Sequence, residues 1–316
     1  MMSKLPWDTD RRLDTALATR IIVAQFPQLA PVSLEFLGSG WDNDAYLVNA
    51  EWVFRFPRRA DAVERVQREM AIMPVIAQAV DLPVPAYEFV GEADDLFPYI
   101  FGGYRILPGT RAAAVRLPQQ DQPVLAKQLG KFFTQLHSIP AHQLPPGDEK
   151  ISWTQSPADR LAELGEVADS FRAAVGPDVA RRWESWLHCE VTIPPAYCGL
   201  LRFTHNDLGD DHLLLDAATR RAVGVIDWAD SALGDPCVDF IFLHHWLGAD
   251  FIERVLEYYE LPLDDGFRER LQFFTTVTAL IWTADSFRMD DAAEIRRWVN
   301  WFVNVSERSL PGWPNL

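Results

Sequence analysis

The residues with the clearest chemical pattern lie between Phe203 and Asp227. Asp207 lies two residues after His205, and Asp227 ends the apolar run that begins at Val223. Two β-like runs joined by a turn bring their ends together, so both carboxylates can face the same small volume. Phosphoryl transfer needs such a pair, because one carboxylate takes or orients a hydroxyl proton while another holds the metal that bridges the phosphates. The pattern therefore predicts Asp207 as the catalytic base and Asp227 as a metal ligand.

The spacing of these residues matches the kinase catalytic loop, which reads H-x-D-x-x-x-x-N and is followed by a DFG-like Asp. The segments His205-Asn-Asp-Leu, Ile226-Asp-Trp-Ala-Asp and Gly234-Asp-Pro-x-x-Asp-Phe together resemble the aminoglycoside and macrolide phosphotransferase family. The resemblance covers most of residues 35–245 and includes three further segments: a phosphate-covering loop at Gly38-Ser-Gly-Trp-Asp-Asn43, a third strand at Val53–Pro57 and a first C-lobe helix at Leu129–His137.

This resemblance implies an α+β, two-lobed protein-kinase-like fold, with a small β-rich N-lobe and a larger, mostly helical C-lobe. Residues 1–106 are expected to form the nucleotide-binding lobe, from an N-terminal helix, an antiparallel sheet and one long helix. Residues 107–316 are expected to form the helical lobe with the catalytic loop and the acceptor pocket. The implied cofactor is Mg²⁺, with Mn²⁺ as an alternative, and the co-substrate is ATP or GTP.

The order of elements along the chain leads to the same α+β plan. Apolar residues at helical spacing predict a helix over residues 11–25 and a long one over 61–79, which Pro74 ends or kinks. Past Pro108-Gly109 helical patterns dominate, with one β-like interruption over 203–227. Five further strands are predicted before that hinge, at 32–38, 44–50, 51–57, 86–91 and 98–106.

Two positions depart from the usual kinase pattern. His212 stands where most kinases carry a metal-binding Asn, and we expect it to be a metal ligand. Since Mg²⁺ prefers oxygen ligands, an imidazole there favours tolerance of Mn²⁺. Arg55 stands in the place of the third-strand Lys that holds phosphates, and it keeps the charge with a different geometry. Its expected partner on the long helix is Glu69, with Glu64 as second choice.

The nucleotide is expected to contact backbone groups from two segments. The peptide groups of Ser39 and Gly40 lie in a Gly-rich turn between two strands and would cover the phosphates, although such turns are common in hairpins. The peptide groups of Arg105 and Leu107, in the connection between the lobes, would read the edge of the base. Backbone hydrogen bonds there can serve adenine or guanine, so the sequence does not choose between ATP and GTP.

The acceptor pocket is expected beyond Asp207, in the C-terminal lobe. Asp211, Asp230 and Glu260 are the predicted substrate residues. Acidic groups suit a polycationic aminoglycoside, and aromatic groups suit a macrolide or another bulky hydroxyl compound. Both kinds of side chain are present, so the acceptor stays open. The remaining candidates for the walls are Asp210, His244, Trp246, Tyr258, Tyr259, Trp282 and Asp285.

Three polar residues near Asp207 are expected to support the site rather than react. His205 belongs to the catalytic loop, and its expected role is to shape that loop. Asp235 and Asp239 open an apolar helical segment, so helix capping or bracing of the loop is expected of them.

The composition narrows the class of partner. Lys and Arg number 29 and Asp and Glu 45, a net charge of 29 − 45 = −16, which argues against nucleic acids and anionic membranes. Acidic surface favours cationic small molecules by steering, or simply keeps a protein soluble. The three cysteines have neither zinc-binding nor disulfide spacing. Neither a signal peptide nor a membrane-spanning run is apparent, so we expect a cytoplasmic protein that is a monomer or a weak dimer.

The leading hypothesis from the sequence is a small-molecule kinase that phosphorylates a hydroxyl of an antibiotic-like acceptor, an aminoglycoside or a macrolide. Antibiotic resistance would be its biological effect. One alternative is a housekeeping kinase of the same fold that acts on a sugar, an amino alcohol or a glycated amine. Another is a nucleotide-binding protein with weak catalysis, which the substituted Lys and Asn positions favour and the intact Asp207 and Asp227 oppose.

Overall fold

The computed structural model describes residues 13–145, 152, 156–189, 193–288 and 292–309. The chain forms two compact units, and neither is continuous in sequence. The first unit comprises Met1–Arg116, His142–Asp148 and His212–Asp230. The second comprises Leu117–Ala141, Glu149–Asp211 and Ser231–Leu316. The division of function at residue 106 stays a prediction.

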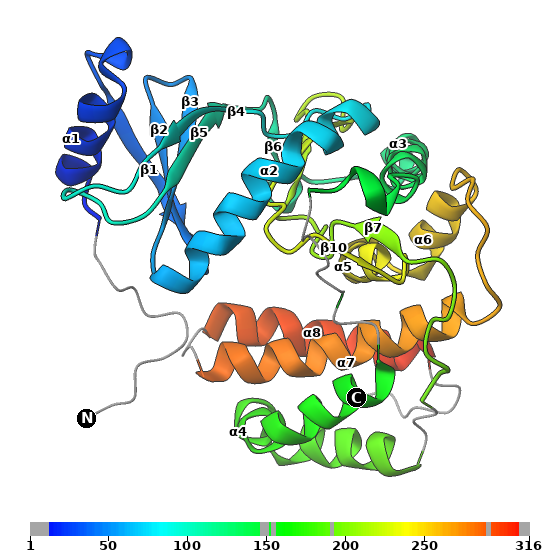
Figure 1. Ribbon diagram of the computed structural model, residues 1–316. Helices are drawn as coiled ribbons and strands as arrows, with labels where there is room; N and C mark the ends of the chain where they lie inside the picture. The colour runs from blue at the N-terminus through cyan, green and yellow to red at the C-terminus, as the bar shows by residue number, and fades with distance from the viewer. Residues whose placement is uncertain (1–12, 146–151, 153–155, 190–192, 289–291, 310–316) are drawn as a thin grey trace. The chain divides into compact units, whose positions relative to one another are not determined.

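The first unit contains a five-stranded antiparallel sheet with the strand order β1-β2-β3-β5-β4 (Figure 1). Its strands are β1 (Leu34–Ser39), β2 (Asn43–Val48), β3 (Trp52–Pro57), β4 (Tyr87–Gly91) and β5 (Phe101–Arg105). Two helices accompany the sheet, α1 (Thr15–Gln25) and α2 (Val63–Ala79). Pro74 lies inside α2 without ending it, and the helix continues to Ala79.

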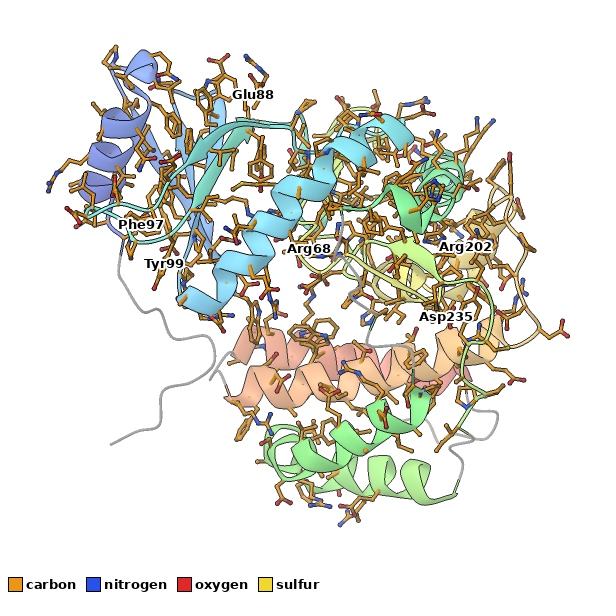
Figure 2. All side chains as sticks on the ribbon, viewed as in Figure 1. Arg68, Glu88, Phe97, Tyr99, Arg202 and Asp235 are labelled. Carbon is orange, nitrogen blue, oxygen red and sulfur yellow. The ribbon has the colours of Figure 1, made fainter. Side chains whose placement is uncertain are left out.

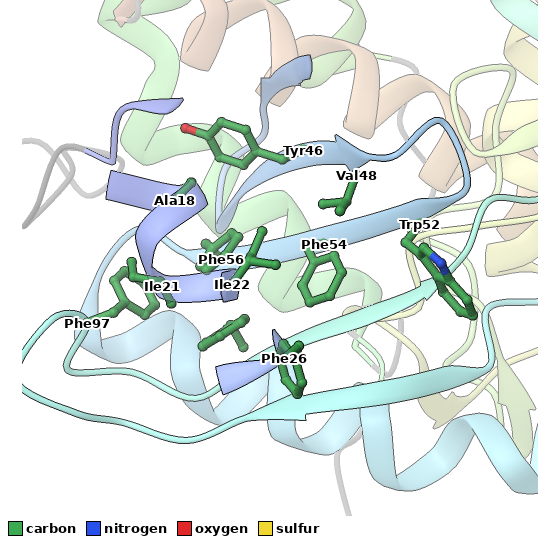
Figure 3. Close-up of a cluster of buried hydrophobic side chains, with 11 residues drawn as sticks. Ala18, Ile21, Ile22, Phe26, Tyr46, Val48, Trp52, Phe54, Phe56 and Phe97 are labelled. Carbon is green, nitrogen blue, oxygen red and sulfur yellow. The ribbon is translucent and has the colours of Figure 1, made fainter. Parts of the chain in front are cut away.

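The central strand β3 is buried along its whole length. Its side chains alternate between the faces of the sheet, so Trp52, Phe54 and Phe56 share one face and Arg55 lies on the other. The aromatic face packs with Ile21 of α1 in a cluster of buried apolar side chains (Figure 3). Aromatic rings carry much of this contact, since Phe56 stacks on Phe101 with a centroid distance of 4.5 Å. Each buried ring removes a large apolar area from water and so stabilises the sheet.

The connection between β4 and β5 is held to the same core. The ring of Phe97 is buried and meets the ring of Tyr99 edge to face, with centroids 5.4 Å apart (Figure 2). Phe97 also contacts Phe56 at 5.3 Å. These contacts tie the connection to the central strand.

A small three-stranded sheet with the order β6-β8-β9 completes the first unit. It consists of β6 (Thr110–Arg111), β8 (Leu213–Leu215) and β9 (Ala222–Val225). Gly109, which precedes β6, has a φ of 106°, and a Cβ there would lie 2.5 Å from Val223 Cγ2. Only glycine fits this close approach. The Pro108-Gly109 segment therefore packs directly on the hairpin that leads to Asp227.

The second unit is mostly helical. Two short strands, β7 (Arg202–Thr204) and β10 (Ala232–Gly234), pair antiparallel beside the predicted catalytic loop. In Figure 1, α4, α7 and α8 lie side by side, and α4 and α8 both contact α7. The helices are α3 (Gln122–His137), α4 (Pro157–Cys189), α5 (Val238–Leu247), α6 (Ala249–Leu256), α7 (Phe267–Arg288) and α8 (Ala292–Ser309).

Short 3₁₀ turns connect these elements: Pro27–Leu29, Ala60–Ala62, Ala112–Ala114, Gln119–Asp121 and Ala141–Gln143. The long helix α4 is interrupted at Gly176, whose φ of 79° is not helical and precedes Pro177. Glycine tolerates this φ and proline cannot continue the hydrogen-bond ladder, so the pair explains the kink. In the part of the chain that the structure describes, no helix is long and apolar enough to cross a membrane.

Candidate functional site

The sequence-predicted site residues fall in both units, and the first unit contains a charged centre around Arg55. The guanidinium of Arg55 donates two hydrogen bonds from Nη1 to the Glu69 carboxylate, at 2.8 and 2.9 Å. Its Nη2 donates to Asp227 Oδ1 at 2.8 Å. Arg55 thus pairs with Glu69, the first of the two expected partners, and also with a carboxylate that the sequence did not suggest as a partner.

Burial sets the electrostatics of this centre. Glu69 is fully buried on α2 and also accepts a hydrogen bond from the Tyr87 hydroxyl at 3.0 Å. Burial raises the pKa of Glu69, and the charge of Arg55 opposes this shift. Burial opposes the charge on Arg55, but Asp227 and Glu69 outweigh it, so the pKa of Arg55 lies well above its ordinary value. The guanidinium is therefore a permanent cation between two carboxylates.

The hairpin of β8 and β9 positions His212 and Asp227. The N–H of Ile226 donates to the His212 carbonyl at 3.0 Å, so the hairpin closes directly before Asp227. Asp227 has a φ of 65°, an unusual conformation for a residue with a side chain. Such strained residues are often found where a side chain is aimed at a ligand. Trp228 anchors the chain just beyond, since it is fully buried and its Nε1 donates to the Val225 carbonyl at 3.2 Å.

The residues around Asp227 fit a divalent cation that is shared with a nucleotide. His212 Nε2 lies 3.7 Å from Asp227 Oδ2, and the other oxygen of that carboxylate, Oδ1, accepts the hydrogen bond from Arg55. Asp227 keeps 41% of its side chain exposed. Among the residues that the structure describes, His, Cys, Asp and Glu form no group of three that could hold a metal ion. Mg²⁺ usually takes one or two protein carboxylates together with substrate phosphates and water, so Asp227 can serve as such a ligand when a nucleotide is bound.

The predicted phosphate-covering loop is braced by arginines. Within it, the Gly40 N–H donates to the Asn43 carbonyl at 2.8 Å. Arg58 Nη1 donates to the Gly40 carbonyl at 2.7 Å, and Arg59 Nη2 donates to Asp42 at 2.6 Å. The hydroxyl of Ser39 donates a hydrogen bond to the nearby Asp44 carboxylate. Phosphate contact by the peptides of Ser39 and Gly40 stays a prediction.

The predicted base-reading segment follows β5. Arg105 pairs in register with Trp52, stacks its guanidinium 4.5 Å from the centre of that ring and forms an ion pair with Glu51. The N–H of Ile106 donates to the Glu51 carbonyl. Leu107 packs on the hairpin, because a Cβ at Gly224 would lie 3.2 Å from Leu107 Cδ1. The side chain of Arg105 is therefore engaged within the sheet, and base recognition by the peptides of Arg105 and Leu107 stays a prediction.

The second unit contains the predicted catalytic loop around Asp207. Asp207 is partly exposed, whereas His205 and Asn206 are buried. The Asp207 N–H donates to His205 Nδ1 at 3.3 Å, an internal bond that shapes the loop. Asn206 has a φ of 72° and accepts a hydrogen bond from Ser152 Oγ at 2.7 Å. The loop thus holds its flanking side chains inside while it presents Asp207.

Asp239 braces this loop from α5. Its carboxylate accepts hydrogen bonds from the N–H groups of His205 at 3.0 Å and Asn206 at 2.7 Å. The same carboxylate lies 3.0 Å from His137 Nε2, and His137 Nδ1 lies 2.9 Å from the Tyr259 hydroxyl. Of the two roles expected for Asp239, capping or bracing, the structure shows bracing. The sequence missed His137 as part of the network, although its place at the end of a resembling helix was a usable signal.

Asp235 has a different set of partners. It accepts from the Cys237 N–H at 3.0 Å and pairs with the buried Arg270 at 2.5 Å. Arg270 also binds Asp264 at 2.7 Å. The hydrogen bonds from Arg270 hold the pKa of Asp264 below its ordinary value. This cluster locks the segment before α5 to the start of α7.

The predicted substrate residues have separate surroundings. Asp211, in the second unit, forms an ion pair with Arg297 at 3.0 Å. Asp230, in the first unit, lies 3.5 Å from Arg65. Glu260 follows α6 and its N–H donates to Thr134 Oγ1 at 2.9 Å. Substrate contact by these three residues stays a prediction.

Known proteins resemble this chain in sequence and in structure. The sequence profile of the phosphotransferase enzyme family matches residues 33–273. The GDP and kanamycin complex of APH(2")-IIIa is 25% identical, with 93% of this chain and 99% of that chain covered and a TM-score of 0.74. The apoenzyme of the macrolide 2'-phosphotransferase MphH from Brachybacterium faecium is 22% identical, with 90% and 93% covered and a TM-score of 0.60.

A relative in sequence is the uncharacterised protein YcbJ of Bacillus subtilis. It is 26% identical over 220 residues, which are 66% of this chain and 67% of that protein. The structural likenesses confirm the predicted α+β kinase-like fold, with an antiparallel sheet in the N-terminal region and helices in the C-terminal region.

Proposed function

Because this chain belongs to the phosphotransferase enzyme family, we propose that it transfers the γ-phosphate of ATP or GTP to a hydroxyl of an antibiotic-like small molecule. The observation that carries this proposal is the contact of the buried Arg55 with both Glu69 and Asp227. A buried cation between two carboxylates is costly unless each charge has a partner. The same three groups suit a site where a cation and a metal share the phosphates of a nucleotide.

Asp227 and His212 are the residues that we propose to hold Mg²⁺, or Mn²⁺ in its place. The bound ion would neutralise charge on the phosphates of the nucleotide. Arg55 would bind phosphate oxygens with N–H groups, for which the flat guanidinium is well suited. Glu69 orients Arg55 from the buried side, since its two oxygens take both bonds from Nη1.

Asp207 is the proposed catalytic base, which takes the proton of the acceptor hydroxyl. The anchoring of His205 and Asn206 by Asp239 supports this role, because a base must be held within hydrogen-bond reach of the proton that it accepts. The side chain of Asp207 is partly exposed, as access for an acceptor hydroxyl requires.

The acceptor class that we propose is an aminoglycoside or a macrolide. The support is likeness to APH(2")-IIIa, whose structure contains GDP and kanamycin, and to the macrolide phosphotransferase. The net charge of −16 favours a small molecule over a nucleic acid. A supply of nucleoside triphosphate is needed, so we propose that the protein works in the cytoplasm.

A panel assay tests this function. Consumption of ATP and GTP is measured with aminoglycosides, macrolides and common hydroxyl metabolites, each with Mg²⁺ and with Mn²⁺. We expect turnover with an antibiotic-like acceptor and its loss in Asp207→Ala. Turnover with a sugar or an amino alcohol alone would indicate a metabolite kinase. Nucleotide binding without turnover on any acceptor would contradict the proposal.

A further inference from the structure

A pocket of about 240 Å³ lies in the second unit, beside the loop that carries Asp207. Its lining includes Phe242, His245 and Trp246 from the segment of α5, Trp298 and Arg297 from α8, and Asp210 from the loop. Gly209 connects the loop to this wall, because a Cβ there would lie 3.0 Å from Phe242 Cβ. The volume is just below the usual range of small-molecule pockets, from about 300 Å³, so it suits one ring of an acceptor.

The aromatic walls are packed against each other. The rings of Phe242 and His245 stack with centroids 5.4 Å apart, and His245 meets Trp298 edge to face at 5.1 Å. Trp298 stacks on Trp282 of α7 at 5.8 Å, and its Nε1 donates to Glu294 at 2.9 Å. Burial holds the pKa of His245 well below its ordinary value, and the nearby His244 and Arg297 add to this effect. At neutral pH the side chain of His245 therefore forms an uncharged part of the pocket wall.

One cation already occupies the acidic side of the pocket. Arg297 Nη2 lies 2.8 Å from Asp210 Oδ1, and Nη1 lies 3.0 Å from Asp211 Oδ2. The guanidinium also lies 3.4 Å from Glu294 and 5.5 Å from the centre of the Trp298 ring. A guanidinium stays charged at any relevant pH, so these carboxylates carry a permanent counter-ion.

From this geometry we propose that Arg297 determines which acceptors bind. It fills the place between Asp210 and Asp211 that an ammonium group of a polycationic acceptor would take. The enzyme therefore selects a bulky, largely uncharged hydroxyl compound, whose ring enters the aromatic pocket. This inference rests on the proposed function, because it concerns the acceptor of that reaction. Arg297 is a specificity residue and takes no part in the chemistry.

The test compares kanamycin with its fully N-acetylated derivative, which keeps the hydroxyls and loses the positive charges. Binding to the wild type and to Arg297→Gln is measured by calorimetry and by tryptophan fluorescence. We expect Arg297→Gln to bind kanamycin about five- to tenfold more tightly than the wild type, because the guanidinium no longer competes with ammonium groups for Asp210 and Asp211. The affinity for the acetylated compound should not rise.

Arg296→Gln is the matched control, since Arg296 is an exposed neighbour on α8 and its replacement changes the net charge equally. It should leave kanamycin affinity unchanged. The gain in Arg297→Gln should fade in high salt, as expected for exposed charges. Equal kanamycin affinity in the wild type and Arg297→Gln, or no binding to either, overturns the inference.

The same variants separate this inference from the proposed function. The binding measurement needs no phosphate transfer, whereas the proposed function needs transfer to at least one acceptor. A charge-dependent gain in Arg297→Gln without any transfer would support the specificity role and contradict the kinase. Transfer without that gain would support the kinase and contradict the specificity role. A thermal melt of Arg297→Gln, whose native side chain is 41% exposed, confirms that it folds.

Discussion

Arg55 Nη2 lies 2.8 Å from Asp227 Oδ1, while Nη1 of the same guanidinium binds Glu69. One arginine thus joins the central strand, the long helix and the hairpin that carries the proposed metal ligand. The side chain of Arg55 is nearly buried and that of Glu69 is fully buried. Water therefore cannot replace either partner if the other is removed. The contact links the stability of the first unit to the geometry of its proposed nucleotide site.

Loss of Glu69 should destabilise the protein strongly. Glu69→Ala leaves Arg55 buried with only Asp227 as a partner, and breaking a buried pair costs about 3 kcal/mol or more. The measurement is the free energy of unfolding from denaturant titration. Glu64→Ala is the control, because Glu64 is exposed on the same helix. A similar loss of unfolding free energy in the two variants would show that the Arg55–Glu69 pair stabilises the protein no more than an exposed carboxylate does.

Replacement of Asp207 should remove catalysis and leave nucleotide binding intact. Asp207→Asn keeps the shape of the side chain but cannot take a proton, so we expect turnover to fall about 10²- to 10⁴-fold. Steady-state kinetics and the nucleotide Kd are measured together. Asp178→Asn, at an exposed position of α4, should behave as the wild type. Retained turnover in Asp207→Asn would remove Asp207 as the base.

His212 should influence the choice of metal ion. His212→Asn replaces an imidazole with an amide oxygen, a ligand that Mg²⁺ prefers. We expect activity at lower Mg²⁺ concentration and a smaller advantage of Mn²⁺. Turnover is followed as a function of the concentration of each ion. Identical metal dependence in wild type and variant would end the proposed ligand role of His212.

The network of His137, Tyr259 and Asp239 should act on kcat rather than on nucleotide KM. His137→Leu removes one partner of the carboxylate that anchors the catalytic loop, and a small displacement of the base can cost about 10²-fold in rate. Tyr259→Phe keeps the ring and removes only the hydroxyl bond to His137, so its effect should be smaller. A fall in kcat that is no larger in His137→Leu than in Tyr259→Phe would contradict this positioning role.

Protonation of His245 should destabilise the folded protein in mild acid. Its pKa is lowered in the folded state, whereas the unfolded chain takes up the proton near pH 6.5. Stability is therefore intact above that pH and falls as the pH drops below it, by up to about 1.4 kcal/mol per pH unit. Denaturant titrations between pH 5 and pH 8 measure this. The slope should be lower in His245→Phe, and an unchanged slope would assign the proton uptake to other groups.

The sequence by itself predicted the fold class and proposed the reactive residues. Short β-like runs around polar turns predicted the strands of the first sheet, helical spacing predicted α2, and the spacing of His205, Asp207 and Asp227 predicted the chemistry. Such patterns are local, because the period of side chains along a strand or helix is set by the backbone alone. The preference for Glu69 over Glu64 also rested on the local sequence, since Glu69 lies within the segment Arg68-Glu-Met-Ala-Ile-Met73.

Tertiary structure alone decided the pairs between distant residues. The Arg55–Asp227 contact joins positions 172 residues apart, and Arg297 reaches Asp210 from a helix 87 residues further along the chain. The packing of His212–Asp230 with the first unit likewise joins segments that are far apart in the sequence. No period along the chain encodes such contacts, because they depend on how finished elements pack and on which buried charges need a partner. The sequence therefore proposed the carboxylates of the site and the Arg55–Glu69 pair, and only the fold showed that Arg55 also contacts Asp227 and that Arg297 contacts Asp210.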